Sequence, residues 1–170
     1  MTKGCYAEGR DGYCEYASKQ AFIIQNQYRV EKGVVPLVWS KELYNVAKIR
    51  SKELTKLFSH RRPDGTYCYT AFTHFFGKER CKHFSNVYSE RLKSIGYSYV
   101  VCADNCYAEN AAGGSMGPEE VIKGWRNSPG HYRTFIDSEL ISGSISCYIT
   151  SDGTKYWISS FAYIDVDNVK

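Results

Sequence analysis

Two histidines and a glutamate, His60, Glu109 and His131, are the side chains of this sequence best placed to do chemistry. His60 precedes a Pro-Asp-Gly turn at 63–65 and His131 follows Pro-Gly at 129–130, so residues that restrict the backbone aim both rings. Neutral imidazole is the commonest metal-ligating side chain, and a carboxylate orients an imidazole by accepting its other N–H. We therefore expect the three side chains to converge on one cleft, with the rings close enough to share a water or a weakly held divalent ion such as zinc.

The same three side chains also suit a buried hydrogen-bond network that pins helices to a sheet. Two histidines and a carboxylate holding zinc, with an open position for water, would instead follow the plan of a hydrolytic site. The sequence has no HExxH motif, however, and Ser59 and Ser128 lack the strand-turn-helix setting of a nucleophilic serine. No catalytic residue is therefore assigned from the sequence.

Three segments show the apolar spacing of amphipathic helices, at 18–32, 40–57 and 118–128. Ser40 is a good N-cap for the second, and Pro118 is typical of a first helical turn. Trp125 lies on the face of the third helix that we expect in the core. His60 and His131 are then each expected just beyond the end of a helix.

Residues 140–150 and 155–164 alternate as strands do, and Asp152-Gly153 between them is a strong hairpin signal. One face of the first strand is expected to be buried, and it carries Ile141, Gly143, Ile145, Cys147 and Ile149. The other face is mostly serine. Helices followed by a hairpin, without βαβ alternation, predict an α+β fold class.

The composition is that of one soluble domain. The chain has 170 residues, 43% hydrophobic and 24% charged, with a formal net charge of +4. Its basic residues are too scattered to indicate a nucleic-acid partner, and no apolar run approaches the ~20 residues of a membrane-spanning helix. We expect a monomer without a transmembrane segment, in which the 15 tyrosines and eight phenylalanines serve mainly packing.

The seven cysteines predict a disulfide framework and hence a secreted or cell-surface protein. Residues 1–5 have no apolar run that could serve as a signal peptide, so we interpret Met1 as an added start residue. A reduced cytosolic protein is the competing reading. Six cysteines allow 15 connectivities, and our expectation is local pairing. The expected pairs are Cys5 with Cys14, Cys68 with Cys81, and Cys102 with Cys106. Cys147, on the strand face expected to be buried, is the candidate free thiol.

Several short blocks along residues 18–163 resemble the CAP superfamily, the cysteine-rich secretory, antigen 5 and pathogenesis-related 1 proteins, in its bacterial SCP-like branch. They are Asn26 with Arg29, Pro36-Leu37 with Trp39-Ser40, Phe58 to Thr66, Ala108-Glu109-Asn110, Trp125 to His131, Ser142-Gly143-Ser144, and Tyr156-Trp157 with Phe161. Each block alone is weak, but the combination is specific.

The resemblance implies a three-layer α-β-α sandwich with a central antiparallel sheet, and a cleft of two histidines and two acids. The matching positions are His60, Glu109 and His131, with Asn110 and Ser128 flanking the cleft. Ser128 stands where many members have a second glutamate, so the full set is absent. We expect an N-terminal arm at 1–17, a single CAP domain at 18–170, and an insertion at about 73–102.

The favoured function is a secreted, non-catalytic module that binds an extracellular ligand, lipid or protein partner. Two alternatives remain open: a metal-assisted hydrolase acting on peptide or cell-envelope material, and a lipid- or sterol-binding protein. Apart from a weakly bound zinc ion at His60 and His131, no cofactor is expected.

Overall fold

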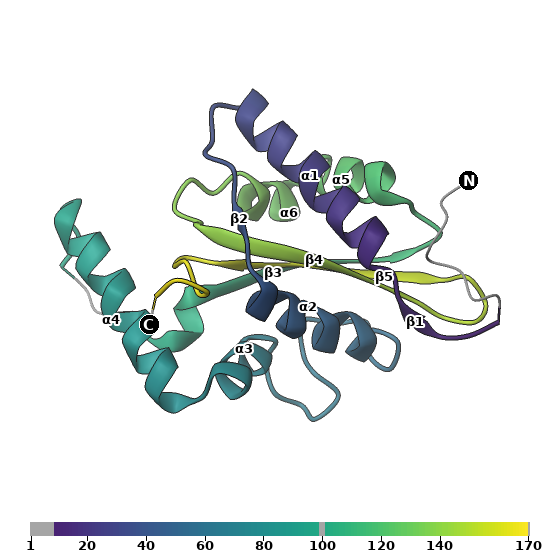
Figure 1. Cartoon of the computed structure of the whole chain (residues 1–170), viewed down its shortest axis with the longest axis horizontal. Coiled ribbons are helices and arrows are strands. Elements are labelled where there is room, and N and C mark those ends of the chain that lie inside the picture. The colour runs from purple at the N-terminus through teal and green to yellow at the C-terminus, as the bar shows by residue number, and fades with distance from the viewer. Residues whose placement is uncertain (1–8, 99–100, 170) are drawn as a thin grey trace.

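A computed structural model describes residues 9–98 and 101–169 and has a five-stranded sheet at its centre (Figure 1). The strands are β1 (Gly12–Tyr13), β2 (Val38–Trp39), β3 (Tyr107–Gly114), β4 (Ser142–Ile149) and β5 (Lys155–Ala162). Their order is β1-β4-β5-β3, with β2 also paired to β4, and every pairing except β2 with β4 is antiparallel. β3 therefore ends the sheet on one side.

Helices cover both faces of the sheet (Figure 1). One layer consists of α1 (Glu15–Glu31), α5 (Pro118–Arg126) and α6 (Pro129–Phe135). The opposite layer consists of α2 (Lys41–Glu53), α3 (Tyr69–Phe76) and α4 (Lys78–Ser94), with the short 3₁₀ helix η1 (Ala103–Cys106) against α4. The predicted α+β class and the α-β-α sandwich are thus confirmed.

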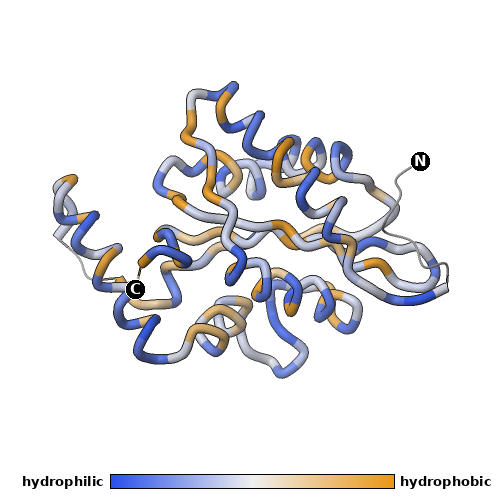
Figure 2. Tube along the Cα trace, viewed as in Figure 1, coloured by the Kyte–Doolittle hydropathy of each residue, from blue (hydrophilic) through white to orange (hydrophobic). Residues whose placement is uncertain are grey.

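The described helices carry hydrophobic residues at intervals between hydrophilic ones, rather than in continuous runs, as the colours along α1 and α4 show (Figure 2). None of them is long and apolar enough to cross a membrane. Each instead turns its apolar side toward the core, so helix and sheet stabilise each other by burying that surface.

Local signals in the sequence explain where α1 and α2 begin. The Ser40 hydroxyl accepts a hydrogen bond from the backbone N–H of Leu43 at 2.9 Å, as an N-cap does. α1 begins earlier than predicted, at Glu15, because the Cys14 sulfur accepts from the backbone N–H of Ala17 at 3.3 Å. Part of the predicted arm is thereby integrated into the domain.

His131 lies beyond the end of α5, as predicted, but it also belongs to a further helix that the sequence did not predict. α5 ends at Arg126, and Pro129 then occupies the first turn of α6, where its missing N–H costs nothing. His131 is therefore a residue of α6. The Pro129-Gly130 pair, which was expected only to end the preceding helix, begins α6.

The hairpin of β4 and β5 is confirmed, with Ile145 and Cys147 buried against Trp157 and Phe161. The serine face of β4 is buried as well, because α2 covers it. Burial of these serines is tolerated where their hydroxyls find partners: Ser146 shares a hydrogen bond of 2.9 Å with Ser51 of α2.

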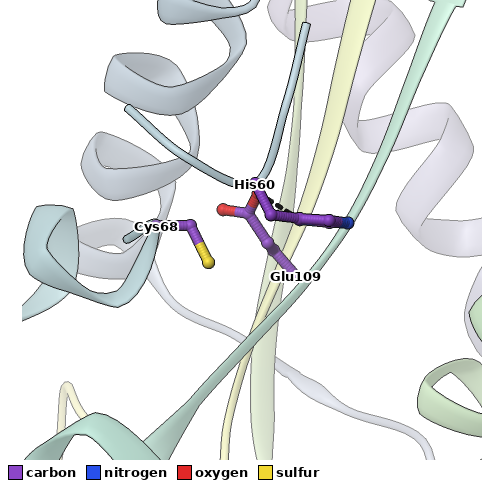
Figure 3. A group of neighbouring side chains, drawn as sticks. All are labelled: His60, Cys68 and Glu109. Carbon is purple, nitrogen blue, oxygen red and sulfur yellow. Dashed lines mark hydrogen bonds and ion pairs between the residues drawn. The ribbon is translucent and has the colours of Figure 1, made fainter. Parts of the chain in front are cut away.

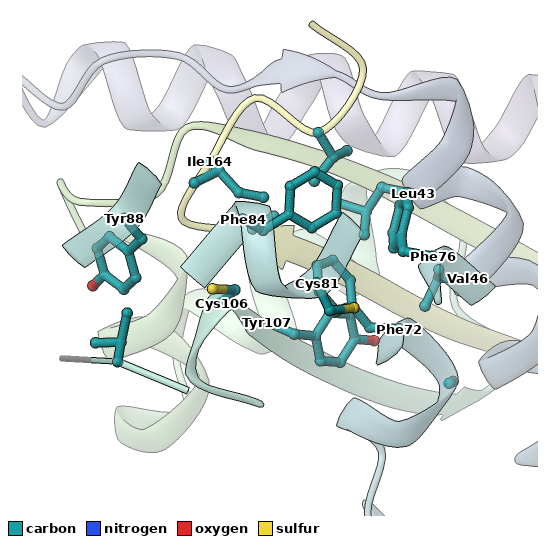
Figure 4. Close-up of a cluster of buried hydrophobic side chains, with 14 of the residues drawn as sticks. Leu43, Val46, Phe72, Phe76, Cys81, Phe84, Tyr88, Cys106, Tyr107 and Ile164 are labelled. Carbon is teal, nitrogen blue, oxygen red and sulfur yellow. The ribbon is translucent and has the colours of Figure 1, made fainter. Parts of the chain in front are cut away.

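Most of the predicted disulfide framework is wrong. Among the described residues the free thiols are Cys68, Cys81, Cys102, Cys106 and Cys147. Cys81 and Cys106 sit as separate side chains within an aromatic core, where free cysteine behaves as a small hydrophobe (Figure 4). The pairing of Cys102 with Cys106 was predicted because the two are close in sequence. Cys102 instead precedes η1 and Cys106 ends it, and the Cys106 thiol faces the Cys102 carbonyl at 3.9 Å.

Cys68 and Cys81 also point to different surroundings. Cys68 lies at the start of α3, whereas the Cys81 thiol, in α4, faces the backbone carbonyl of Thr73 at 3.7 Å. Cys14 is disulfide-bonded. Cys5, its expected partner, lies outside the described residues, so that pairing stays a prediction. Cys147 is free as expected, but it is one of several free thiols.

Thiol labelling should separate these cysteines by burial. Cys102 is exposed and should react first with iodoacetamide, while Cys147 is 0% exposed and burial raises the pKa of its thiol to about 12. Because the thiolate is the reactive form, Cys147 should be among the last thiols modified. Peptide mapping of the native protein checks this order, and equal labelling of Cys102 and Cys147 would contradict it.

Candidate functional site

Glu109 is the centre of the site, and its carboxylate is saturated with hydrogen bonds. Arg50 of α2 donates from Nε to Oε1 and from Nη2 to Oε2, both at 3.0 Å. Tyr107 donates its hydroxyl to Oε1 at 2.9 Å, and His60 Nδ1 lies 3.0 Å from Oε2. A carboxylate has about four lone-pair positions, and all of them are occupied.

Burial and the neighbouring positive charges shift the pKa of Glu109 in opposite directions. The Glu109 side chain is 1% exposed, and burial alone would raise its pKa. The hydrogen bonds and positive charges of His60 and Arg50 outweigh that effect and hold the pKa below its usual value, so the carboxylate stays ionised. Because an ionised carboxylate only accepts hydrogen bonds, His60 must carry its proton on Nδ1.

His60 has one nitrogen fixed and one free. Its side chain is 55% exposed, and among the described residues no hydrogen bond is made by Nε2. In Figure 3 the imidazole lies on one side of the Glu109 carboxylate and Cys68 on the other. Glu109 therefore holds the ring so that Nε2 faces outward to solvent or a ligand.

His131 is held in a similar way by the two flanking residues that the resemblance indicated. Its Nδ1 lies 2.8 Å from the hydroxyl of Ser128, and its backbone carbonyl accepts a hydrogen bond from the Asn110 side chain at 3.0 Å. Ser128, at the position where the resemblance implies a second glutamate, is a neutral group that can orient the imidazole but adds no charge.

The two histidines approach the end of the sheet from opposite layers. Glu109 and Asn110 are adjacent in β3, so their side chains point to opposite faces. Glu109 contacts Arg50 and His60 on the α2 side, while Asn110 contacts His131 on the α6 side. Since β3 is the last strand in the order, side chains from both layers can reach around its open side.

The environments of the two histidines push their pKa values apart. The hydrogen bond to Glu109 raises the pKa of His60 above its ordinary 6.5. Burial, and then the charge of His60, lower the pKa of His131. The rings are therefore within electrostatic reach of each other, although their convergence on one ion stays a prediction.

The order of titration is a direct test of this electrostatic description. His60 should titrate at higher pH than His131 when the ring C–H signals are followed by NMR. The His60 contribution to stability is complete below pH 6.5 and should be lost as the pH rises through the raised pKa. His131 acts in the opposite sense, because its lowered pKa removes stability as the pH falls below 6.5. The reverse order of titration would show that Glu109 does not hold His60 in solution.

A second group of ligand-type side chains converges, but it does not fit a metal ion. Ligand atoms of His60, Cys68 and Glu109 lie within 4.8 Å of one another (Figure 3). Without a metal, burial and the charge of Glu109 raise the pKa of Cys68 to about 12, so its thiol is protonated at neutral pH. Glu109 has no lone pair left for an ion. Nε2 of His60 and Nε2 of His131 make no hydrogen bond among the described residues, and a metal site formed by these two nitrogens stays a prediction.

Arg50 and Tyr107 were not identified from the sequence as site residues. The whole Arg50 side chain is buried, and it also pairs with Glu53 at 2.7 Å. An arginine on the apolar face of an amphipathic helix was the available signal, since a buried charge requires a partner.

Comparison with known proteins supports the class of domain that this fold and site define. A model of the CAP family, described as the cysteine-rich secretory protein family, matches residues 23–79, which include His60. The chain is 27% identical over 121 residues to the uncharacterized protein YkwD of Bacillus subtilis, covering 70% of this chain and 37% of that protein.

Solved structures share the fold over most of the chain. An extracellular protein with an SCP domain from Bacillus anthracis has a TM-score of 0.58 and 19% identity, covering 87% of this chain and 40% of that one. An outer surface protein of Borrelia burgdorferi has a TM-score of 0.63 and 17% identity, covering 91% and 97%. The chain therefore has the fold of these solved structures, and its residues 23–79 match the CAP family. It spans about two-fifths of the length of YkwD and of the Bacillus anthracis protein.

Proposed function

We propose that this chain is a secreted or cell-surface CAP domain that binds a ligand or partner at His60 and His131 without catalysing a reaction. The observation that carries this proposal is the saturation of Glu109 by Arg50, Tyr107 and His60. A carboxylate in that state has no free position from which to take a proton or activate water. It acts instead as a fixed support for one imidazole.

A divalent metal would be held weakly at this site. His60 and His131 each offer Nε2, which makes two protein ligands, whereas catalytic zinc sites use three. Bound zinc would supply a Lewis acid able to polarise a ligand oxygen. The raised pKa of His60 weakens binding further at neutral pH, because a proton competes for the same nitrogen.

The proposed extracellular location is supported by the similar proteins and not by the number of cysteines. Several thiols expected in disulfides are free, so cysteine count no longer argues for an oxidising compartment. The similar proteins are described as extracellular or as an outer surface protein, and we extend that location to this chain.

One observation favours the hydrolase alternative. The pKa values of His60 and His131 are displaced in opposite directions, which is typical of an acid and base pair. A direct experiment distinguishes the two functions: hydrolysis of fluorescent casein and of labelled cell-wall fragments, measured with and without added zinc.

We expect no zinc-dependent turnover from the parent protein, and calorimetry should show weak zinc binding that is lost in His60→Gln and in His131→Gln. His83→Gln, which alters an exposed histidine of α4, is the matched control and should bind zinc as the parent does. Turnover that requires zinc and disappears in His60→Gln would establish the hydrolase instead.

A further inference from the structure

A hollow of about 720 Å³ lies between α3, α4 and η1, and none of its lining residues belongs to the site at His60 and His131. Its lining residues include Thr73, His74, Lys78, Cys81, Lys82 and Ser85. These six lie within the segment that the sequence predicts to be an insertion.

The rim of the hollow is positively charged. Lys78 and Lys82 are one helical turn apart on α4, a spacing that places side chains next to each other. Neither forms an ion pair among the described residues, and no carboxylate is among the described residues that line the hollow. His74 at the end of α3 adds a third nitrogen donor. Two unpaired ammonium groups beside one depression attract an anion.

The floor of the hollow is apolar. Cys81 is 4% exposed and belongs to the core cluster that also contains Phe72, Phe76 and Phe84 (Figure 4). The hydroxyls of Thr73 and Ser85 donate to helix carbonyls, at 3.4 and 2.9 Å. Lys78, Lys82 and His74 are therefore the donors left for a ligand, and the floor offers a hydrophobic contact.

We propose that this hollow binds a small organic anion. The acid group would pair with Lys78 and Lys82, and an aromatic or aliphatic body would lie over the floor at Cys81. Small-molecule sites combine these features, a mostly apolar concave surface with a few charged groups that fix orientation. The proposal does not depend on the function assigned to His60 and His131.

Anilinonaphthalene sulfonate, an aromatic sulfonate whose fluorescence rises in apolar surroundings, is a suitable probe for the full chain. The double variant Lys78→Gln/Lys82→Gln should weaken its binding by about tenfold or more, because two charged contacts are lost. Lys19→Gln/Lys123→Gln is the matched control, since it removes two exposed lysines elsewhere and changes the net charge equally. The control should bind within about twofold of the parent.

Two further measurements locate the probe. Its binding should shift the backbone NMR signals of residues 73–85 and should slow the labelling of Cys81. The neutral analogue N-phenylnaphthylamine should bind the parent and the Lys78→Gln/Lys82→Gln variant equally weakly. The proposal is overturned if the double variant, with a melting curve like that of the parent, binds the sulfonate as tightly as the parent does, or if the NMR shifts lie outside the hollow.

Discussion

Replacing Arg50 with methionine is expected to lower the free energy of unfolding by about 3–5 kcal/mol, the usual cost of removing one partner from a buried ion pair. Arg50 and Glu109 are 0% and 1% exposed, and the variant would leave the Glu109 carboxylate buried without its main counter-charge. Urea denaturation at pH 7 measures the loss.

A double-mutant cycle separates the charge from the packing. Adding Glu109→Leu to Arg50→Met removes the stranded charge, so the double variant should lose much less stability than the two single variants combined. Lys19→Met is the control, because its pair with Glu15 is exposed and should leave the denaturation curve nearly unchanged. An Arg50→Met curve as close to the parent as that of Lys19→Met would show that the buried pair does not hold the site.

Truncating Trp125 to alanine is expected to cost about 3–5 kcal/mol of stability, the range for a buried tryptophan. Its side chain is 2% exposed, packs α5 against the sheet, and donates its indole N–H to the carbonyl of Ala111 in β3 at 3.1 Å. A cavity of that size cannot close without moving α5.

Thermal melting followed by circular dichroism checks the Trp125 prediction, and Trp125→Phe is the conservative comparison. Phenylalanine keeps most of the apolar contact and lacks only the hydrogen bond. The Trp125→Phe variant should therefore lose clearly less stability than the Trp125→Ala variant. A Trp125→Ala variant that melts with the parent would mean that α5 does not depend on this anchor.

The sequence predicted the helices and strands that carry their own local signals. The hairpin at β4 and β5 carries alternation and an Asp-Gly turn, and the start of α2 has its cap at Ser40. β3 was not predicted, because its run of alanine, asparagine and glycine has neither alternation nor β-branched residues. It is held in the sheet by pairing with β5, a contact between distant parts of the chain.

For the candidate site, the contact between His60 and Glu109 was predicted, but the other hydrogen bonds of Glu109 were not. His60 and Glu109 were expected to interact, and they do. The bidentate contact of Arg50 depends on how α2 packs across the sheet, which no local spacing reveals. The disulfide predictions failed for a related reason, because sequence distance does not report in which direction each thiol points.

We propose that Glu109 acts as a saturated support, which leaves Nε2 of His60 and Nε2 of His131 as the binding atoms. Nitrogen-15 NMR of the two imidazoles during a zinc titration tests it most directly. We expect Nδ1 of His60 to stay protonated throughout, while Nε2 of His60 and Nε2 of His131 shift together and saturate at one zinc per chain. A zinc-dependent loss of the proton on Nδ1 of His60, or a shift of His60 without His131, would contradict the claim.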